Sequence, residues 1–227
     1  MDQAVQTVER RTGVDAVFDY LYAEISSMRL LPGTKISEAE IARKFDLSRQ
    51  PVRDAFSRLE NLDLLLIRPQ KATEVKRFSL QAIETARFVR AAVEAEVLRR
   101  ATRLCDAGGA ARLDACLDRQ RTIVDARDYG PFATLDYEFH KTLCEIGDVA
   151  FAFDVIKEQK RKIDRLCVLS LSRGDRIEQL VEDHALIARA VTEGDAEAAV
   201  ANGMLHLSRL DATIDRICAE NADYIDA

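Results

Sequence analysis

The stretch LLPGTKISEAEIARKFDLSRQPVRDAFSRLENLDLLLIRP, residues 30–69, sets the architecture of the first part of the chain. Its Pro-Gly pair predicts a turn. The segment SEAEIARKF then begins with a serine followed three residues later by a glutamate, the capping-box pattern of a helix start. A short turn, DLS, leads into a second helix, RQPVRDAFSRLENL, whose proline lies in the first turn, where its missing N–H costs little. Two short helices joined by a tight turn indicate a helix-turn-helix.

The second of these helices opens with side chains that suit DNA recognition. In a helix-turn-helix, the N-terminal residues of this helix meet base edges in the major groove. The planar fork of Arg49 or Arg53 matches O6 and N7 of guanine, and Gln50 can pair with adenine. Ser48 precedes the helix as its expected cap, and helix N-termini favour phosphate. We therefore expect these four residues to contact DNA.

Segments on both sides of the helix-turn-helix complete a winged helix. Upstream, VDAVFDYLYAEISSMRL has the apolar spacing of an amphipathic helix. Downstream, LLLIRP and TEVKR predict two short strands around Gln70 and Lys71, a β-hairpin wing whose tip places Lys71 near phosphate or the minor groove. Residues 43–77 carry nine basic against five acidic side chains, although the whole chain has a net charge of −6. A locally basic segment joined to an acidic remainder favours a phosphate-bearing partner for the first domain.

These residues resemble the winged helix of the GntR family of bacterial transcription regulators. The similarity lies in PG, SE-x-E-I-A, LSR-x-PVR-x-A and L-x-x-L, in register over about 60 residues. Asp63 stands where the family usually has glycine at the turn into the wing, and Ala72 where the wing tip usually carries glycine. The resemblance implies binding to a DNA operator. Asp63 and Ala72 affect only how closely the backbone of the wing can approach DNA, and not the recognition helix.

The rest of the chain predicts helices and no strands. Glycines and a proline separate six periodic segments joined by short connections, which indicates an antiparallel bundle. The expected helices are 79–105, 110–127, 130–146, 149–171, 174–192 and 195–222. The predicted fold is mainly α, with a winged helix-turn-helix carrying a small β-hairpin wing in residues 1–78 (1–13 being a polar tail). A six-helix bundle follows in residues 79–227.

The three histidines of the chain lie on apolar faces of different expected helices. His140 follows Asp136 by four residues in FATLDYEFHKTLCEIG, and His184 and His206 lie on later apolar stripes. Buried carboxylates and imidazoles are costly unless they are paired. Together they suit Zn, Ni, Fe or Mn, and an i, i+4 pair can chelate from one helix face. The alternative is three hydrogen-bonded core histidines in a bundle that only dimerises.

LDYEFHKTL, EDHALIARAVTEGDAEAA and MLHLSRL resemble the ligand-binding FCD domain of the FadR subfamily of GntR regulators. The resemblance implies that Asp136, His140, His184 and His206 bind one divalent metal ion, with zinc the first choice and Ni, Mn or Fe the alternatives. It also implies that a carboxylate effector completes the coordination of that metal. The expected count of six helices places the domain nearer the VanR-type branch.

Two further side chains are candidates for holding the effector. Arg90 matches an arginine common in the first helix of the domain, although it could equally form an i, i+4 ion pair with Glu94. Asn202 lies one turn before His206 on the same face. We expect a DNA-binding regulator, acting as a homodimeric repressor on a palindromic operator and controlled by a small carboxylate metabolite.

Two other functions remain open at this point. A metal-dependent enzyme would use the same four residues, but no HExxH motif occurs and no histidine follows a glutamate by three residues, as di-iron bundles require. A DNA-binding regulator with a metal-free, purely dimerising bundle is the other alternative. No apolar run approaches the roughly 18 residues that span a bilayer. The N-terminus lacks the apolar core of a signal peptide, and the five scattered cysteines form no C-x-x-C pair. We expect a cytoplasmic protein with no membrane partner.

Overall fold

A computed structural model of the chain describes residues 12–127, 130–171 and 174–226. These residues form two compact units, 12–78 with 223–226 and 79–222. The assignment of residues 223–226 to the helical domain is therefore corrected. Their backbone pairs with Phe78 instead, whose N–H donates to the Tyr224 carbonyl and whose carbonyl accepts from Asp226 N–H, both at 2.8 Å. Most of the polar tail, residues 1–11, lies outside the described residues.

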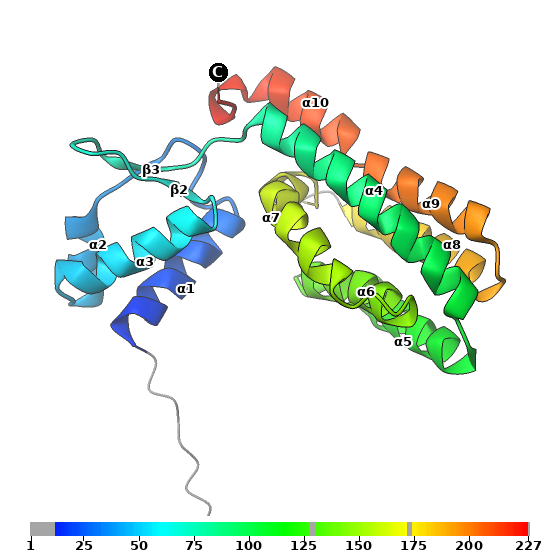
Figure 1. Cartoon of the computed structure of the whole chain (residues 1–227). Helices are drawn as coiled ribbons and strands as arrows, with labels where there is room; N and C mark the ends of the chain where they lie inside the picture. The colour runs from blue at the N-terminus through cyan, green and yellow to red at the C-terminus, as the bar shows by residue number, and fades with distance from the viewer. Residues whose placement is uncertain (1–11, 128–129, 172–173, 227) are drawn as a thin grey trace, which may run out of the picture. The chain divides into compact units, whose positions relative to one another are not determined.

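Three helices form most of the first unit: α1 (Gly13–Ser26), α2 (Glu38–Phe45) and α3 (Arg49–Asn61) (Figure 1). Helix α1 begins at a capping box between Thr12 and Asp15, so the expected tail ends one residue earlier. Ser37 caps α2, accepting from Glu40 N–H at 3.4 Å. Packing of α1 against α3 buries one apolar face of each helix. In these two helices the residues with no exposed surface are Val17, Leu21, Ile25, Val52, Ala55 and Leu59.

Ser48 is the N-cap of α3, but its side chain makes no capping hydrogen bond, which corrects the expected cap. A capping oxygen accepts from the second or third N–H of the helix. The third residue of α3 is Pro51, which has no N–H to donate. The hydroxyl of Ser48 is exposed and does not stabilise the helix in this way.

The expected two-stranded hairpin of the wing is present, and a third strand extends it into a three-stranded sheet. Strands β2 (Leu65–Leu66) and β3 (Thr73–Val75) form the hairpin, and β1 (Lys35–Ile36) pairs antiparallel with the other edge of β3. At the turn into the wing, Asp63 has a left-handed backbone with φ of 62°. Its carboxylate pairs with Lys76, so this residue adopts the conformation for which the family uses glycine.

The second unit is helical. Its described residues form seven α-helices where six were expected, and the mainly α fold class is confirmed. The helices are α4 (Leu80–Leu104), α5 (Ala107–Asp125), α6 (Phe132–Ile146), α7 (Ala152–Leu171), α8 (Gly174–Thr192), α9 (Ala196–Ser208) and α10 (Asp211–Glu220). The short 3₁₀ helix η1 (Ala222–Tyr224) then begins at the last residue of this unit and ends in the first unit. None of the described helices is long and apolar enough to cross a membrane.

The expected sixth helix, 195–222, is divided between α9 and α10. At the division, Arg209 N–H bonds to the carbonyl of His206, three residues back, at 3.3 Å. The hydroxyl of Ser208 donates to the Leu205 carbonyl at 2.8 Å and competes with the helical pattern. This break uses neither glycine nor proline. The second unit therefore does not show the six helices on which the similarity to a VanR-type branch was based.

Helix α4 is central to the second unit and packs against α6, α7, α8 and α9. Figure 1 shows α4 and α9 side by side. Gly203 of α9 leaves room for the Leu98 side chain of α4, because a Cβ at this position would lie 2.4 Å from Leu98 Cδ1. Three of these four helices, α6, α8 and α9, carry the three histidines and Asp136 into the interior.

Candidate metal centre and DNA-binding helix

The exposed start of α3 carries the residues expected to read DNA. Arg49, Gln50 and Arg53 are exposed. The Gln50 amide donates to Asp54 Oδ1 at 2.9 Å, and Arg53 Nε donates to Glu38 Oε2 at 3.0 Å. Arg49 forms no hydrogen bond or ion pair with the described residues, so its guanidinium is the one most available for a base edge. Lys71 is exposed at the wing tip, beside Gln70, whose φ is 59°.

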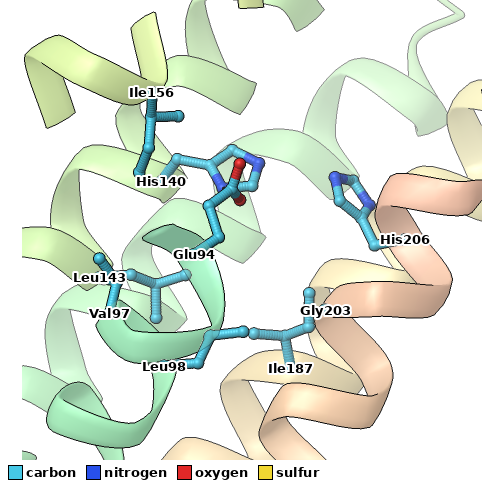
Figure 2. A pocket seen from close by; sticks show the side chains of 9 residues that line it. All are labelled: Glu94, Val97, Leu98, His140, Leu143, Ile156, Ile187, Gly203 and His206. Carbon is cyan, nitrogen blue, oxygen red and sulfur yellow. The ribbon is translucent and has the colours of Figure 1, made fainter. Parts of the chain in front are cut away.

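The structure brings together all four residues expected to bind a metal. Asp136 and His140 come from α6, His184 from α8 and His206 from α9, and all four are buried. One ligand atom from each lies within 4.8 Å of those of the others. Figure 2 shows His140 and His206 reaching from their separate helices toward one interior space.

The spacing within this cluster suits a small metal ion. Nε2 of His184 lies 3.5 Å from Asp136 Oδ1, and Nε2 of His140 lies 3.9 Å from the same oxygen. Zinc–ligand distances of about 2.0–2.2 Å place the atoms of a tetrahedral site about 3.4 Å apart. Asp136, His140 and His184 could therefore bind one ion through these atoms after small side-chain adjustments.

Two of the three histidines have a hydrogen-bond partner on their outer side. His140 Nδ1 lies 3.0 Å from Glu94 Oε2, and His184 Nδ1 lies 2.8 Å from Gln120 Oε1. A carboxylate or an amide oxygen only accepts, so both Nδ1 atoms donate, and the lone pair of each ring is on Nε2. These two Nε2 atoms are buried without a hydrogen-bond partner among the described residues. Metal-binding histidines have the same arrangement, because an outer partner fixes the tautomer that points a lone pair at the metal.

His206 is oriented less tightly. Its Nδ1 lies 3.8 Å from Asp183 Oδ2, beyond hydrogen-bond distance. Asp183 is buried and is itself held by the guanidinium of Arg209, through bonds of 3.1 and 3.0 Å. A short movement of the His206 ring would complete this outer contact.

The protonation states of the cluster favour binding of a cation. Burial lowers the pKa of His184 well below its ordinary value and also lowers the pKa of His206, so both rings are neutral. Burial alone would raise the pKa of Asp136, but nearby positive charge, that of Lys160 first, more than offsets it, and its pKa is lowered. Arg90 and His140 likewise lower the pKa of Glu94 against the effect of burial. Neutral imidazoles and an ionised carboxylate are the forms that bind a metal.

Lys160 of α7 is a partner of this cluster that sequence reasoning missed. Its Nζ lies 3.1 Å from Asp136 Oδ2 and 2.9 Å from Asp164 Oδ1. Gln120, Asp183 and Arg209 were also missed, since each acts across helices and no local pattern marks it. Glu94 was considered only as a partner of Arg90.

Neither of the two residues expected to hold an effector is among the residues that line the cavity beside the cluster. Arg90 Nε donates to Glu94 Oε1 at 2.8 Å, which is the ion pair considered as its alternative. Asn202 donates to the Leu186 carbonyl at 3.2 Å and joins α9 to α8. The cavity has a volume of about 10 Å³. It is lined by Glu94, Val97, Leu98, His140, Leu143, Ile156, Ile187, Gly203 and His206 (Figure 2).

A winged helix joined to a helical unit with a buried polar cluster defines a class of DNA-binding transcription regulators. Residues 14–75 match the bacterial regulatory proteins of the gntR family, and residues 86–209, more than half of the chain, match the FCD domain. The chain belongs to the GntR family of transcription regulators, in the group that carries an FCD domain. It is a regulator and not an enzyme.

Curated relatives agree with this assignment. The HTH-type transcriptional repressor RspR of Escherichia coli is 31% identical over 208 residues, which are 92% of this chain and 91% of the relative. The HTH-type transcriptional regulator LutR of Bacillus subtilis is 24% identical over 221 residues, covering 87% of this chain and 99% of the relative.

Solved structures share the fold. McbR/YncC of Escherichia coli has a TM-score of 0.70 at 16% identity, with 90% of this chain and 98% of that one covered. A GntR transcriptional regulator from Rhodococcus sp. RHA1 also has a TM-score of 0.70, at 20% identity, with 92% and 99% covered.

Proposed function

We propose that this protein is a homodimeric, cytoplasmic repressor that binds a palindromic DNA operator and is controlled by a small carboxylate. The carboxylate would bind at a divalent metal ion held by Asp136, His140, His184 and His206. Zinc is the first choice, with Ni, Mn or Fe as alternatives, because the donors are three imidazoles and one carboxylate. The proposal rests on two buried Nε2 atoms that have no hydrogen-bond partner in the described part of the chain. They belong to His140 and His184, whose Nδ1 atoms are fixed from outside.

The cavity beside the metal centre narrows the class of effector. Apart from His140 and His206, its lining consists of aliphatic residues and Gly203, with Glu94 as the one charged side chain. Aliphatic walls offer no hydrogen bonds to hydroxyl groups, and the negative charge of Glu94 disfavours a second carboxylate. A volume of about 10 Å³ is close to what one water molecule needs. We therefore favour a short aliphatic monocarboxylate, whose tail enters after small side-chain shifts.

In DNA binding, α3 would lie in the major groove with Arg49 at a base edge. Ser48 and Lys71 are exposed and would contact phosphate, while Gln50 and Arg53 would exchange their intramolecular partners for DNA. Control by an effector requires that the effector bind the DNA-competent and DNA-incompetent states unequally. Two-fold symmetry of a dimer would be matched by two-fold symmetry of the operator.

The metal-free, purely dimerising bundle stays a second candidate because of one contact. Lys160 lies 3.1 Å from Asp136 Oδ2 and gives this buried carboxylate a cation without any metal. Elemental analysis of protein purified without chelator separates the two candidates. We expect about one divalent ion per chain in the wild type and a clear loss in His140→Ala. Metal-free wild type would contradict the proposed mechanism of control.

The effector is tested on the metal-loaded protein by thermal shift. Acetate, propionate and butyrate should raise the melting temperature by mass action, and succinate should raise it less. The same acids should have no effect after chelation, and an acid that binds should change affinity for operator DNA. Tighter binding of succinate than of butyrate would contradict the aliphatic class while leaving the metal centre intact.

A further inference from the structure

Lys160 is an unusual residue for the interior of a helical bundle. Its side chain is 10% exposed, and a buried ammonium group is costly unless it is paired. Nζ lies 2.9 Å from Asp164 Oδ1 and 4.3 Å from the centre of the Tyr137 ring. The Tyr137 hydroxyl donates to the other oxygen of Asp164 at 2.6 Å. This network of α6 and α7 residues fixes the ammonium group beside Asp136.

The two carboxylate oxygens of Asp136 face different partners: one faces the proposed metal site and the other faces Lys160. Oδ1 faces the histidines, 3.5 Å from His184 Nε2 and 3.9 Å from His140 Nε2. Oδ2 lies 3.1 Å from Lys160 Nζ. The carboxylate therefore has a positive partner on one side even when nothing binds on the other.

We propose that Lys160 is a stand-in cation, which compensates Asp136 whenever the metal ion is absent and so keeps the metal-free helical unit folded. The inference rests on the metal centre proposed above and adds a residue that sets its affinity. Lys160 contacts the ligand residue rather than the metal, so it is a positioning residue. Its presence makes metal binding reversible, because loss of the ion leaves no uncompensated charge in the core.

Thermodynamic linkage gives the expected effect of removing Lys160. Without it, Asp136 in the metal-free state is a buried charge with no partner, which is strongly destabilising. In the metal-loaded state the ion compensates the same carboxylate, so the loss is smaller there. The metal-free state is raised in free energy more than the loaded state, and metal binding becomes tighter. Removal of a positive charge near the ion acts in the same direction.

The test compares full-length wild type, Lys160→Met and a matched control, Lys162→Met. Lys162 is on the same helix, and its ammonium group contacts Gln159 and Glu158 rather than Asp136. Melting temperature is measured after chelation and after addition of zinc, and the zinc dissociation constant is measured by chelator competition. We expect Lys160→Met to melt well below wild type without zinc and near wild type with it. Its zinc affinity should rise by about tenfold or more, while Lys162→Met should match wild type.

A second variant covers the case in which metal-free Lys160→Met fails to fold. Asp136→Asn combined with Lys160→Met removes both charges, so its metal-free form should be more stable than Lys160→Met alone. Equal loss of stability with and without zinc, weaker zinc binding, or no rescue by Asp136→Asn would overturn the role of Lys160. If the wild type binds no zinc at all, the proposed metal centre fails and this inference fails with it. If the wild type binds zinc and Lys160→Met behaves like wild type, only this inference fails.

Discussion

Gln120 of α5 fixes the tautomer of His184 on α8. Its Oε1 lies 2.8 Å from His184 Nδ1, and its amide nitrogen donates to the Leu135 carbonyl at 3.2 Å. The second bond decides which end of the amide faces the ring, because only the nitrogen can donate to a carbonyl. His184 Nδ1 must then donate, and its Nε2 lone pair faces Asp136.

Replacement of Gln120 by Met should therefore weaken metal binding without removing a ligand. The side chain keeps a similar length, but the ring of His184 loses the acceptor that fixes it. Loss of such an outer partner lowers metal affinity by about 10–100-fold, measurable by chelator competition. Gln159→Met is a suitable control, since Gln159 is also buried but bonds Lys162. Unchanged affinity in Gln120→Met would mean that packing alone orients His184.

Stability of the metal-free protein should fall as the pH is lowered from about 7 toward 5. The pKa values of His184 and His206 are lowered in the folded state, mainly by burial. Below the unfolded pKa of about 6.5, the unfolded chain binds protons that the folded chain does not, so stability is lost as pH falls. The slope can reach about 1.4 kcal/mol per pH unit for each histidine. Urea unfolding in the presence of chelator at several pH values measures this slope. His184→Gln should make the free energy of unfolding depend less on pH.

Sequence patterns predicted those parts of the fold that depend on residues close together in the chain. The Pro-Gly turn and the capping residue Ser37 predicted the start of α2. The i, i+4 spacing of Asp136 and His140 predicted that both side chains lie on one buried helix face. Strand β1 has two residues, too few for any periodic pattern. The division of α9 from α10 has a local cause in the Ser208 hydroxyl, but serine within a helix is common and gives no distinct signal.

The residues that contact the metal ligands from other helices could not be predicted, and the reason is tertiary packing. Gln120 and Lys160 look like ordinary polar positions of amphipathic helices, and their burial depends on which helices meet them. Asp183 is adjacent to His184 in sequence, yet its carboxylate lies toward His206 on the next helix. Contacts between helices are set by tertiary packing, which sequence spacing along one helix does not contain.

Ser37→Ala and Ser48→Ala should separate a structural cap from a DNA contact. Ser37 accepts a hydrogen bond from Glu40 N–H, so its loss should lower the free energy of unfolding by about 1 kcal/mol. Ser48 makes no capping bond, so Ser48→Ala should leave unfolding almost unchanged and weaken DNA binding. Urea denaturation and binding to operator DNA give the two readouts. A stability loss in Ser48→Ala equal to that in Ser37→Ala would show that Ser48 acts as a cap after all.

Gly203→Ala should destabilise the helical unit because the added methyl group collides with the buried Leu98 side chain of α4. The added Cβ would lie 2.4 Å from Leu98 Cδ1, and overpacking of this kind costs about 1–3 kcal/mol. The same methyl group would enter the cavity beside His206 and weaken binding of an aliphatic acid. Leu98→Ala should partly rescue the stability of Gly203→Ala, so a double-mutant cycle is the measurement. Strictly additive losses would place the two side chains out of contact.

Arg49→Ala and Lys71→Ala should weaken DNA binding in different ways. Arg49 is exposed at the start of α3 and forms no hydrogen bond or ion pair within the part of the chain described, so its fork is available to a guanine. Its loss should cost about 1–3 kcal/mol on the operator and little on random duplex. Lys71 at the wing tip would contact phosphate, so Lys71→Ala should weaken binding to both duplexes alike and flatten the salt dependence. Fluorescence anisotropy with both duplexes, at several salt concentrations, tests both substitutions. Equal losses on operator and random DNA for Arg49→Ala would contradict its role in base reading.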